Sequence, residues 1–556
     1  MSLPRRWQPL CIAALALLAS STASADGEQC SLHRDLPIER QLRRLSIDLR
    51  GDVPDFTEYA AVEGKTEIPE AIIDAYLDSD ALRLQMRRYH EELLWTNPAP
   101  ALSDVGFSLG SQTFAGGGST VFFVTSTTKS KLYRGGDGTH RCQDKPQSAL
   151  GYDAAGLPNT EPAGADAVGP FVAEGWVDVH PYWEADPSKT IKVCAFDAQV
   201  TESYTLPPND PDAGTWPCDD LLATGKAKTC GCGPNLAYCM VTGSVQPVVL
   251  ASMREQLLRL VDDYTSGARP YSELLTTKRA WINGPLVHYF RYLAQRQTYS
   301  RTQSFHQPSD GPLPDLPFTA TDTWVEIERG APHAGILTLP AYLLRFQTNR
   351  GRANRYRIAF QGQYFQPPST KDTGCAKEGD DLTQRCVCRQ CHMALEPMAA
   401  YFGQLTEAGS TSLHDFASEY ATRKACSSAS PTLSSAGYCD RFYVTVPDLV
   451  DPDLRPYKLK ALRYADAAHP EIQPHFDAGP GALAQADIDS KNHLFYAVVT
   501  RSMFRFLMKR DPYLDQTSPD YEGDLIDQIA EEMSAKDSLP WLIKRLVTLP
   551  AYRRTP

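Results

Sequence analysis

Cys388-Arg389-Gln390-Cys391-His392 opens the segment Met393-Ala394-Leu395-Glu396-Pro397-Met398, whose apolar residues recur at helical spacing. Cys-x-x-Cys-His is the attachment signature of haem c, in which two thiols add to the vinyl groups of the haem and the histidine coordinates its iron. Helical spacing brings both sulfurs to one edge of the porphyrin. The motif predicts one covalent haem c, tethered by Cys388 and Cys391 with His392 as proximal iron ligand, in a cytochrome c-like helical region.

Two other interpretations of the same pentapeptide are a redox-active dithiol and a disulfide beside an incidental histidine. A thioredoxin-like dithiol needs a βαβ context. Here the motif follows a polar loop at 377–383 and begins a helix that contains Leu395 and Met398. This context favours haem attachment.

The sixth ligand of the iron decides between two functions. A methionine sulfur favours electron transfer, whereas an open position lets oxygen or peroxide bind. Met503 lies on an apolar helical segment and is the predicted distal ligand, with an ordinary core methionine as the alternative. His493 and His333 are rival ligands. Glu396 is the carboxylate that could shape the haem pocket, or it lies on a helix surface.

The first 25 residues predict export. Arg5 and Arg6 precede an apolar stretch at 10–19, and Ala23-Ser24-Ala25 offers a cleavage site for signal peptidase. A membrane anchor is the weaker alternative, because this stretch has about 10 apolar residues where a span needs about 20. Residues 1–25 are therefore predicted to be a signal peptide of a periplasmic or secreted protein, without stable membrane insertion.

Cysteine usage fits an oxidising compartment. Cleavage leaves an odd number of the 14 cysteines, so disulfides alone cannot account for all of them. Cys375 with Cys386 and Cys426 with Cys439 are candidate disulfides, although sequence does not fix partners. Cys30 is the candidate for a free thiol.

Composition and length predict a multidomain globular chain. The chain has 556 residues and is 42% hydrophobic, and a single core rarely exceeds roughly 250 to 300 residues. The pattern predicts an N-terminal helical domain at 26–98, a Cys-rich β and loop insertion at 99–245, and a helical region with the haem motif at 246–556. The fold class is mainly α with a β-rich, disulfide-containing insertion.

The insertion offers a second metal hypothesis. Cys218, Cys230, Cys232 and Cys239 could form a four-thiolate zinc site. The usual Cys-x-x-Cys pairs are absent, however, and export favours disulfides. Nucleic acid is an improbable partner, because the formal net charge is −12 and no basic cluster is present.

Several segments resemble one family, the planctomycete-type cytochrome-domain proteins, which are large exported bacterial haem c proteins built from uncharacterised domains. The segments that carry the resemblance are 43–51 with Pro54, 269–275, 334–338, 352–355, 388–397 and 538–553. Glu396 stands where the family usually has Asp. The resemblance implies haem c and export and leaves 99–245 unmatched.

The function predicted is an exported monohaem c-type cytochrome-like protein that transfers one electron. The first alternative is a haem-dependent oxidase, peroxidase or oxygenase with an open distal site. The second is a ligand-binding protein that uses the 99–245 insertion. The redox partner protein or small-molecule substrate is not identified by the sequence.

Overall fold

The computed structural model describes most of the chain in separate stretches. The described residues are 35–97, 107–125, 141–152, 160–161, 171–172, 174–206, 208, 214–217, 231–241, 243–294, 305–306, 312–365, 383, 386–405, 409–410, 412–413 and 472–554.

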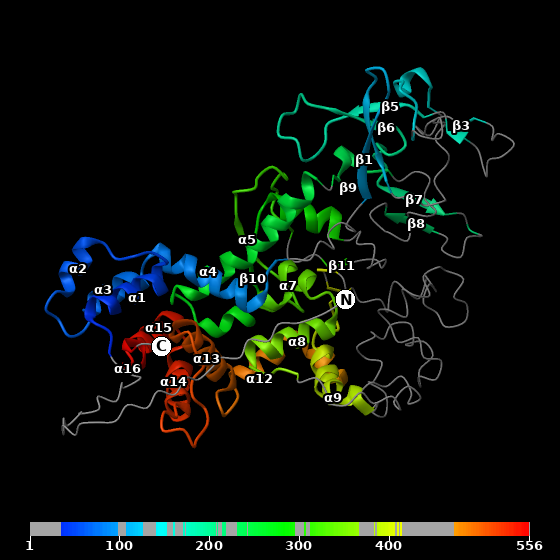
Figure 1. Cartoon of the computed structure of the whole chain (residues 1–556). Helices are drawn as coiled ribbons and strands as arrows, with labels where there is room; N and C mark the ends of the chain where they lie inside the picture. The colour runs from blue at the N-terminus through cyan, green and yellow to red at the C-terminus, as the bar shows by residue number, and fades with distance from the viewer. Residues whose placement is uncertain are drawn as a thin grey trace, which may run out of the picture.

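Most regular structure is helical. The α-helices are α1 (Ile38–Arg50), α2 (Phe56–Val62), α3 (Glu70–Leu77), α4 (Asp80–Leu94), α5 (Val245–Thr265), α6 (Gly284–His288), α7 (Pro340–Arg345), α8 (Asn349–Phe360), α9 (Cys386–Ala400), α12 (Ile472–Ile488), α13 (Leu494–Met508), α14 (Gly523–Lys536), α15 (Leu539–Val547) and α16 (Pro550–Arg553). In Figure 1 the first helices (blue) and the last helices (red) lie side by side at one end of the molecule. The Tyr552 hydroxyl of α16 donates to Asp48 of α1 at 2.8 Å, so the two ends of the described chain are joined directly.

Local sequence explains where several helices begin. Asp55 and Glu58 form a reciprocal capping box at the start of α2. The Ser79 hydroxyl caps α4 by accepting from the Leu82 amide, and Ser538 caps α15 in the same way. These side chains satisfy backbone amides that have no partner within the helix.

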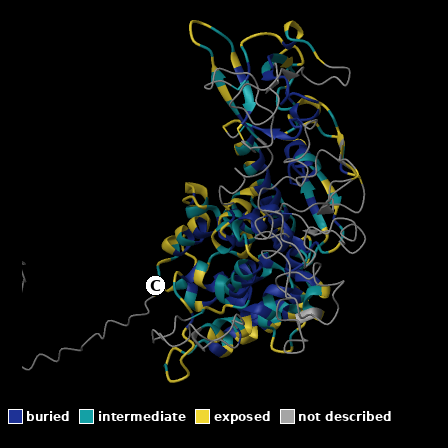
Figure 2. Ribbon diagram, turned by 90° about the vertical axis from the view of Figure 1, so that its right-hand side faces the viewer, coloured by how far each residue is buried: buried dark blue, intermediate teal, exposed yellow. Residues whose placement is uncertain are grey.

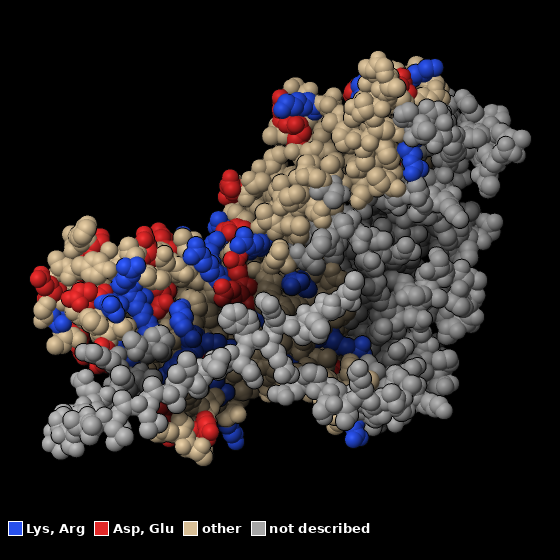
Figure 3. All heavy atoms as spheres, in the orientation of Figure 1, with Lys and Arg blue, Asp and Glu red and all other residues tan. Residues whose placement is uncertain are grey.

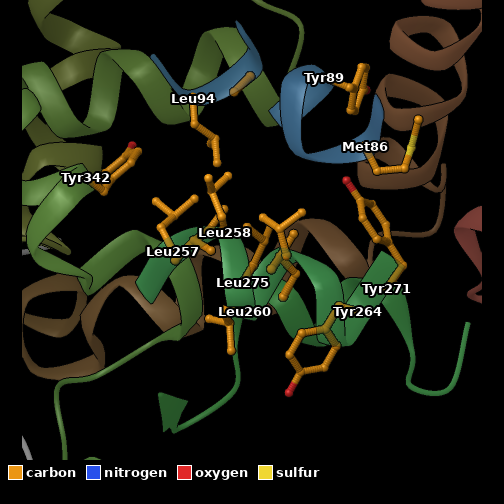
Figure 4. Close-up of a cluster of buried hydrophobic side chains, with 14 of the residues drawn as sticks. Met86, Tyr89, Leu94, Leu257, Leu258, Leu260, Tyr264, Tyr271, Leu275 and Tyr342 are labelled. Carbon is orange, nitrogen blue, oxygen red and sulfur yellow. The ribbon is translucent and has the colours of Figure 1, made fainter. Parts of the chain in front are cut away.

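One hydrophobic core joins the N-terminal and C-terminal helices. Figure 4 shows part of it, where Leu94 of α4 points toward Leu258 of α5 and Met86 of α4 lies beside Tyr271. The buried residues form a continuous interior through the helical body (Figure 2). Outside this core, basic and acidic side chains lie side by side on the helical surface (Figure 3). The Arg87 guanidinium, for example, pairs with Asp262 at 2.6 Å and so fastens α4 to α5.

The β-rich part is a five-stranded sheet in the order β5-β6-β2-β1-β9. Its strands are β1 (Phe107–Thr113), β2 (Thr120–Val124), β5 (Trp176–Val179), β6 (Ile191–Cys194) and β9 (Cys239–Met240). β1 pairs antiparallel with β2, β5 antiparallel with β6, and the β2–β6 and β1–β9 pairs are parallel. Disulfides join Cys142 to Cys194 and Cys232 to Cys239. A mainly helical chain with a β-rich, disulfide-containing segment is therefore confirmed.

The remaining strands form two-stranded pairs. They are β3 (Thr160–Glu161) with β4 (Phe171–Val172), β7 (Ser203–Leu206) with β8 (Gly214–Pro217), β10 (Arg279–Ile282) with β12 (Val325–Glu328), and β11 (Phe305–His306) with β13 (Ser412–Leu413).

Several elements of the predicted helical region at 246–556 are interrupted. Arg279–Ile282 pairs with β12, so α6 begins only at Gly284. Thr348 adopts an extended conformation and caps α8, which separates α8 from α7. The left-handed backbone of Asp537 ends α14 before α15 begins.

Other predictions meet the described residues only in part. The zinc hypothesis is wrong for Cys232 and Cys239, which are bonded to each other. The signal peptide at 1–25, Cys30, Cys375, Cys426, Cys439 and the side chain of Cys386 lie outside the described residues. The boundaries 26–98, 99–245 and 246–556 stay predictions. Among the described helices, none combines the length and the apolar character that crossing a bilayer needs.

Candidate functional site

The Cys-x-x-Cys-His motif lies in the first turns of α9, which packs against α8 and α12 (Figure 1). Cys388 and Cys391 are partly exposed, and both thiols are free. They are three positions apart on the helix, so the two sulfurs are nearly one turn apart on the same side. α9 packs among helices rather than on a parallel sheet, which disfavours the thioredoxin-like interpretation.

His392 is oriented by a buried carboxylate one turn along α9. Its Nδ1 lies 2.5 Å from Oε1 of Glu396. The Glu396 side chain is only 2% exposed, whereas that of His392 is 21% exposed. An ionised carboxylate can only accept, so Nδ1 donates to Glu396, and the neutral imidazole with this hydrogen bond has the lone pair of Nε2 free for a metal. This is the arrangement in which a histidine binds a metal through one nitrogen and is held by a hydrogen bond through the other.

Arg350 of α8 completes this cluster. Its Nε donates to the same Glu396 oxygen at 2.6 Å, and the Thr348 cap fixes the start of α8 two residues earlier. A buried carboxylate is costly unless charge and hydrogen bonds compensate it. Arg350 therefore holds Glu396 in place, and Glu396 holds the imidazole of His392.

A second arginine of α8 lies beside the motif. Burial lowers the pKa of the Arg357 guanidinium, and an interaction with Cys391 opposes part of this effect. Its Nη2 donates to Gln363 at 3.0 Å, and its guanidinium lies 3.8 Å from the centre of the Phe365 ring. Its buried Nη1 has no hydrogen-bond partner among the described residues. Such an orphan donor next to a motif is consistent with a group that completes the site.

These residues fit a covalent haem c. Two free thiols at helical spacing suit the vinyl groups, and an imidazole with an available Nε2 suits the iron. Within the described stretches, no group of three or more His, Cys, Asp or Glu side chains could hold a metal ion on its own. Haem iron needs at most two protein ligands, since the porphyrin supplies four.

The three candidates for the distal ligand lie in different surroundings. Met503 is fully buried in the helical core on α13. His333 is buried with Nδ1 on the Thr338 hydroxyl, and its Nε2 has no partner among the described residues. His493 precedes α13 in a left-handed conformation. Among the described residues, the structure records no contact of His392 with any of the three, so the distal ligand stays a prediction.

Sequence reasoning missed three contributors to this region. Arg350 and Arg357 lie seven residues apart on one face of α8, and the run of arginines at 350–357 was the available signal. His475 of α12 stacks on Tyr401 with ring centroids 4.5 Å apart. Its Nδ1 lies 3.2 Å from the Pro397 carbonyl oxygen. These contacts fix α12 against the end of α9. His475 lies more than 70 residues from both partners, so no spacing in the sequence could have indicated the contacts.

Comparison with known proteins adds no relative. No family model matches the chain, and no curated protein or solved structure matches it at a significant level. The resemblance to planctomycete-type cytochrome-domain proteins accordingly stays a prediction.

Proposed function

We propose that the protein is an exported monohaem c-type cytochrome-like protein that transfers single electrons. The observation that carries the proposal is the cluster of His392, Glu396 and Arg350 beside two free cysteines. A buried carboxylate that fixes one nitrogen of a partly exposed histidine has a clear purpose when the other nitrogen binds a metal.

Each residue has a distinct task in this proposal. Bound haem supplies a one-electron iron couple. Cys388 and Cys391 hold it covalently, so it is not lost in either oxidation state. Glu396 keeps the proton of His392 on Nδ1 and limits rotation of the ring. Arg350 offsets the charge of Glu396, and this moderates how strongly the carboxylate favours the oxidised state.

Export is the second part of the proposal. The disulfides Cys142–Cys194 and Cys232–Cys239 would persist in an oxidising compartment. The predicted signal peptide at 1–25 would bring the chain there. Haem attachment in that compartment would use the same thiols that oxidation would otherwise pair.

The direct test is expression of the full chain in a host with a cytochrome maturation system. We expect haem staining after denaturing electrophoresis and a haem c spectrum in alkaline pyridine. Replacing Cys388 and Cys391 by Ala should abolish the stain. The matched control replaces Cys142 and Cys194, which also removes two cysteines but leaves the motif intact, and it should keep the stain per molecule. A stain that persists when Cys388 and Cys391 are replaced, or a wild type without stain, would contradict the proposal.

Carbon monoxide binding distinguishes electron transfer from the oxidase, peroxidase or oxygenase alternative. A stable sixth ligand such as Met503 should prevent prompt binding to the reduced protein. Prompt binding with a spectral shift would instead show an open or labile distal position.

A further inference from the structure

Helix α8 packs against both α4 and α13 in the helical body (Figure 1). A cavity of about 690 Å³ opens there, between the end of α4, the outer face of α8 and the loop at 511–514. This volume lies in the range of pockets that hold small organic molecules. None of the haem-site residues lines it, so the inference below does not rest on the proposed function.

Basic side chains dominate the polar part of the cavity. Arg355, Arg501 and Arg505 line it together with two acids, Glu92 and Asp511. Arg505 is neutralised by Asp511, with which it forms an ion pair. Glu92 is exposed. With three arginines and two acids, the side chains that line the cavity carry a net charge of about +1.

Two of these guanidinium groups have unused donors. Arg355 is 6% exposed and donates from Nη2 to the backbone carbonyls of Glu92 and Leu93. Its Nε and the Nε of Arg501 are buried without a partner among the described residues. Burial also lowers the pKa of Arg355. Arg355 and Arg501 both line the cavity, so each brings a guanidinium group with an unsatisfied donor to its wall.

The rest of the wall is apolar and aromatic. Trp95 is 53% exposed and Tyr364 is 61% exposed, which is unusual for such large rings. The Arg355 guanidinium lies 4.1 Å from the centre of the Trp95 ring. Trp95 also adopts a left-handed backbone at the end of α4, with φ of 51°, a conformation that is rare for a bulky residue. Ile358, Val498 and Leu514 continue the apolar surface.

We propose that this cavity binds a small organic monocarboxylate with an aromatic or apolar body. The carboxylate would accept from Arg355 and Arg501, and the body would pack on Trp95 and Tyr364. A single net positive charge matches a monoanion better than a doubly charged phosphate. The apolar wall adds affinity that inorganic anions cannot gain.

Isothermal titration calorimetry on the full purified chain tests the assignment with cinnamate as the probe. Cinnamyl alcohol, which has the same ring without the charge, and inorganic phosphate, which has charge without a ring, are the comparison ligands. We expect cinnamate to bind and both comparison ligands to bind about tenfold or more weakly. Equal affinity of either comparison ligand, or no heat with millimolar cinnamate, would overturn the proposal.

Variants locate the binding site. Arg501→Gln should weaken cinnamate binding about tenfold or more. Tyr364→Ala should also weaken cinnamate binding, and because Tyr364 is exposed, this substitution should leave the fold intact. Arg545→Gln on α15, which removes an arginine paired with Glu532 outside the cavity, is the matched control and should bind as the wild type does. Wild-type affinity in both cavity variants, with folding verified by circular dichroism, would place the ligand elsewhere and refute the assignment.

Discussion

Under the proposed function, replacing Glu396 by Gln should raise the reduction potential of the haem that the motif would bind. The Glu396 carboxylate accepts from His392 Nδ1 at 2.5 Å, and iron(III) draws more electron density from the imidazole than iron(II) does. The carboxylate therefore stabilises the oxidised state more, as hydrogen bonding of a metal-bound histidine generally does. The amide of Gln is neutral and removes this preference while it keeps the size of the side chain.

The magnitude follows from the strength of the bond. A hydrogen bond to a charged group contributes about 1.5–3 kcal/mol and a neutral one about 0.5–1.5 kcal/mol, so the substitution removes about 1 kcal/mol of preference. For a one-electron couple, 59 mV corresponds to about 1.4 kcal/mol. The expected rise is about 40 mV. Because Arg350 binds the same oxygen, Arg350→Gln should shift the potential in the opposite direction.

Spectroelectrochemical titration at neutral pH measures these shifts. The control is Glu532→Gln on α14, which also removes an arginine-paired carboxylate but lies outside the haem motif. It should leave the potential unchanged. A fall in potential for Glu396→Gln, or shifts of the same sign for both haem-site variants, would refute the assigned roles.

Three further predictions concern stability and ligand exchange. Removing the Cys142–Cys194 disulfide, which spans 52 residues, should lower the free energy of unfolding by about 4 kcal/mol, and removing Cys232–Cys239, which spans 7, by about 2 kcal/mol. Denaturant titration of the two double Ala variants measures both losses. A larger loss of stability for the shorter span would contradict the prediction. Burial lowers the pKa of His90 from 6.5 to about 4, so the unfolded chain takes up this proton at higher pH than the folded one. The free energy of unfolding should therefore fall by up to about 3 kcal/mol as pH falls from 6.5 to 4, and His90→Gln should make that fall shallower; an unchanged slope would contradict this. The reduced haem protein should not bind carbon monoxide promptly, as followed by its visible spectrum, and immediate binding would favour an open distal site.

Sequence predicted the parts of the fold that depend on neighbouring residues. Within the region predicted to be helical at 26–98, α4 begins at Asp80 after the Ser79 cap, and its apolar residues recur at helical spacing. The pentapeptide at 388–392 likewise predicts its chemistry from spacing alone. These signals are local, so no tertiary contact is needed to read them.

Long-range contacts could not be predicted in this way. The sheet order places β6 beside β2 although 66 residues separate the end of β2 from the start of β6. Arg350 reaches Glu396 across 46 residues, and an arginine-rich helix does not reveal which carboxylate it will contact. The cavity beside Trp95 depends on three helices from distant parts of the chain. Packing determines these features, and no single segment contains them.

The intact mass of the mature chain, produced in a host that can attach haem, tests the central claim most directly. We predict a mass that exceeds the polypeptide by one haem and returns to the polypeptide mass when Cys388 and Cys391 are replaced by Ala. A wild-type chain without added mass, produced alongside a control cytochrome that acquires its haem, would contradict the account.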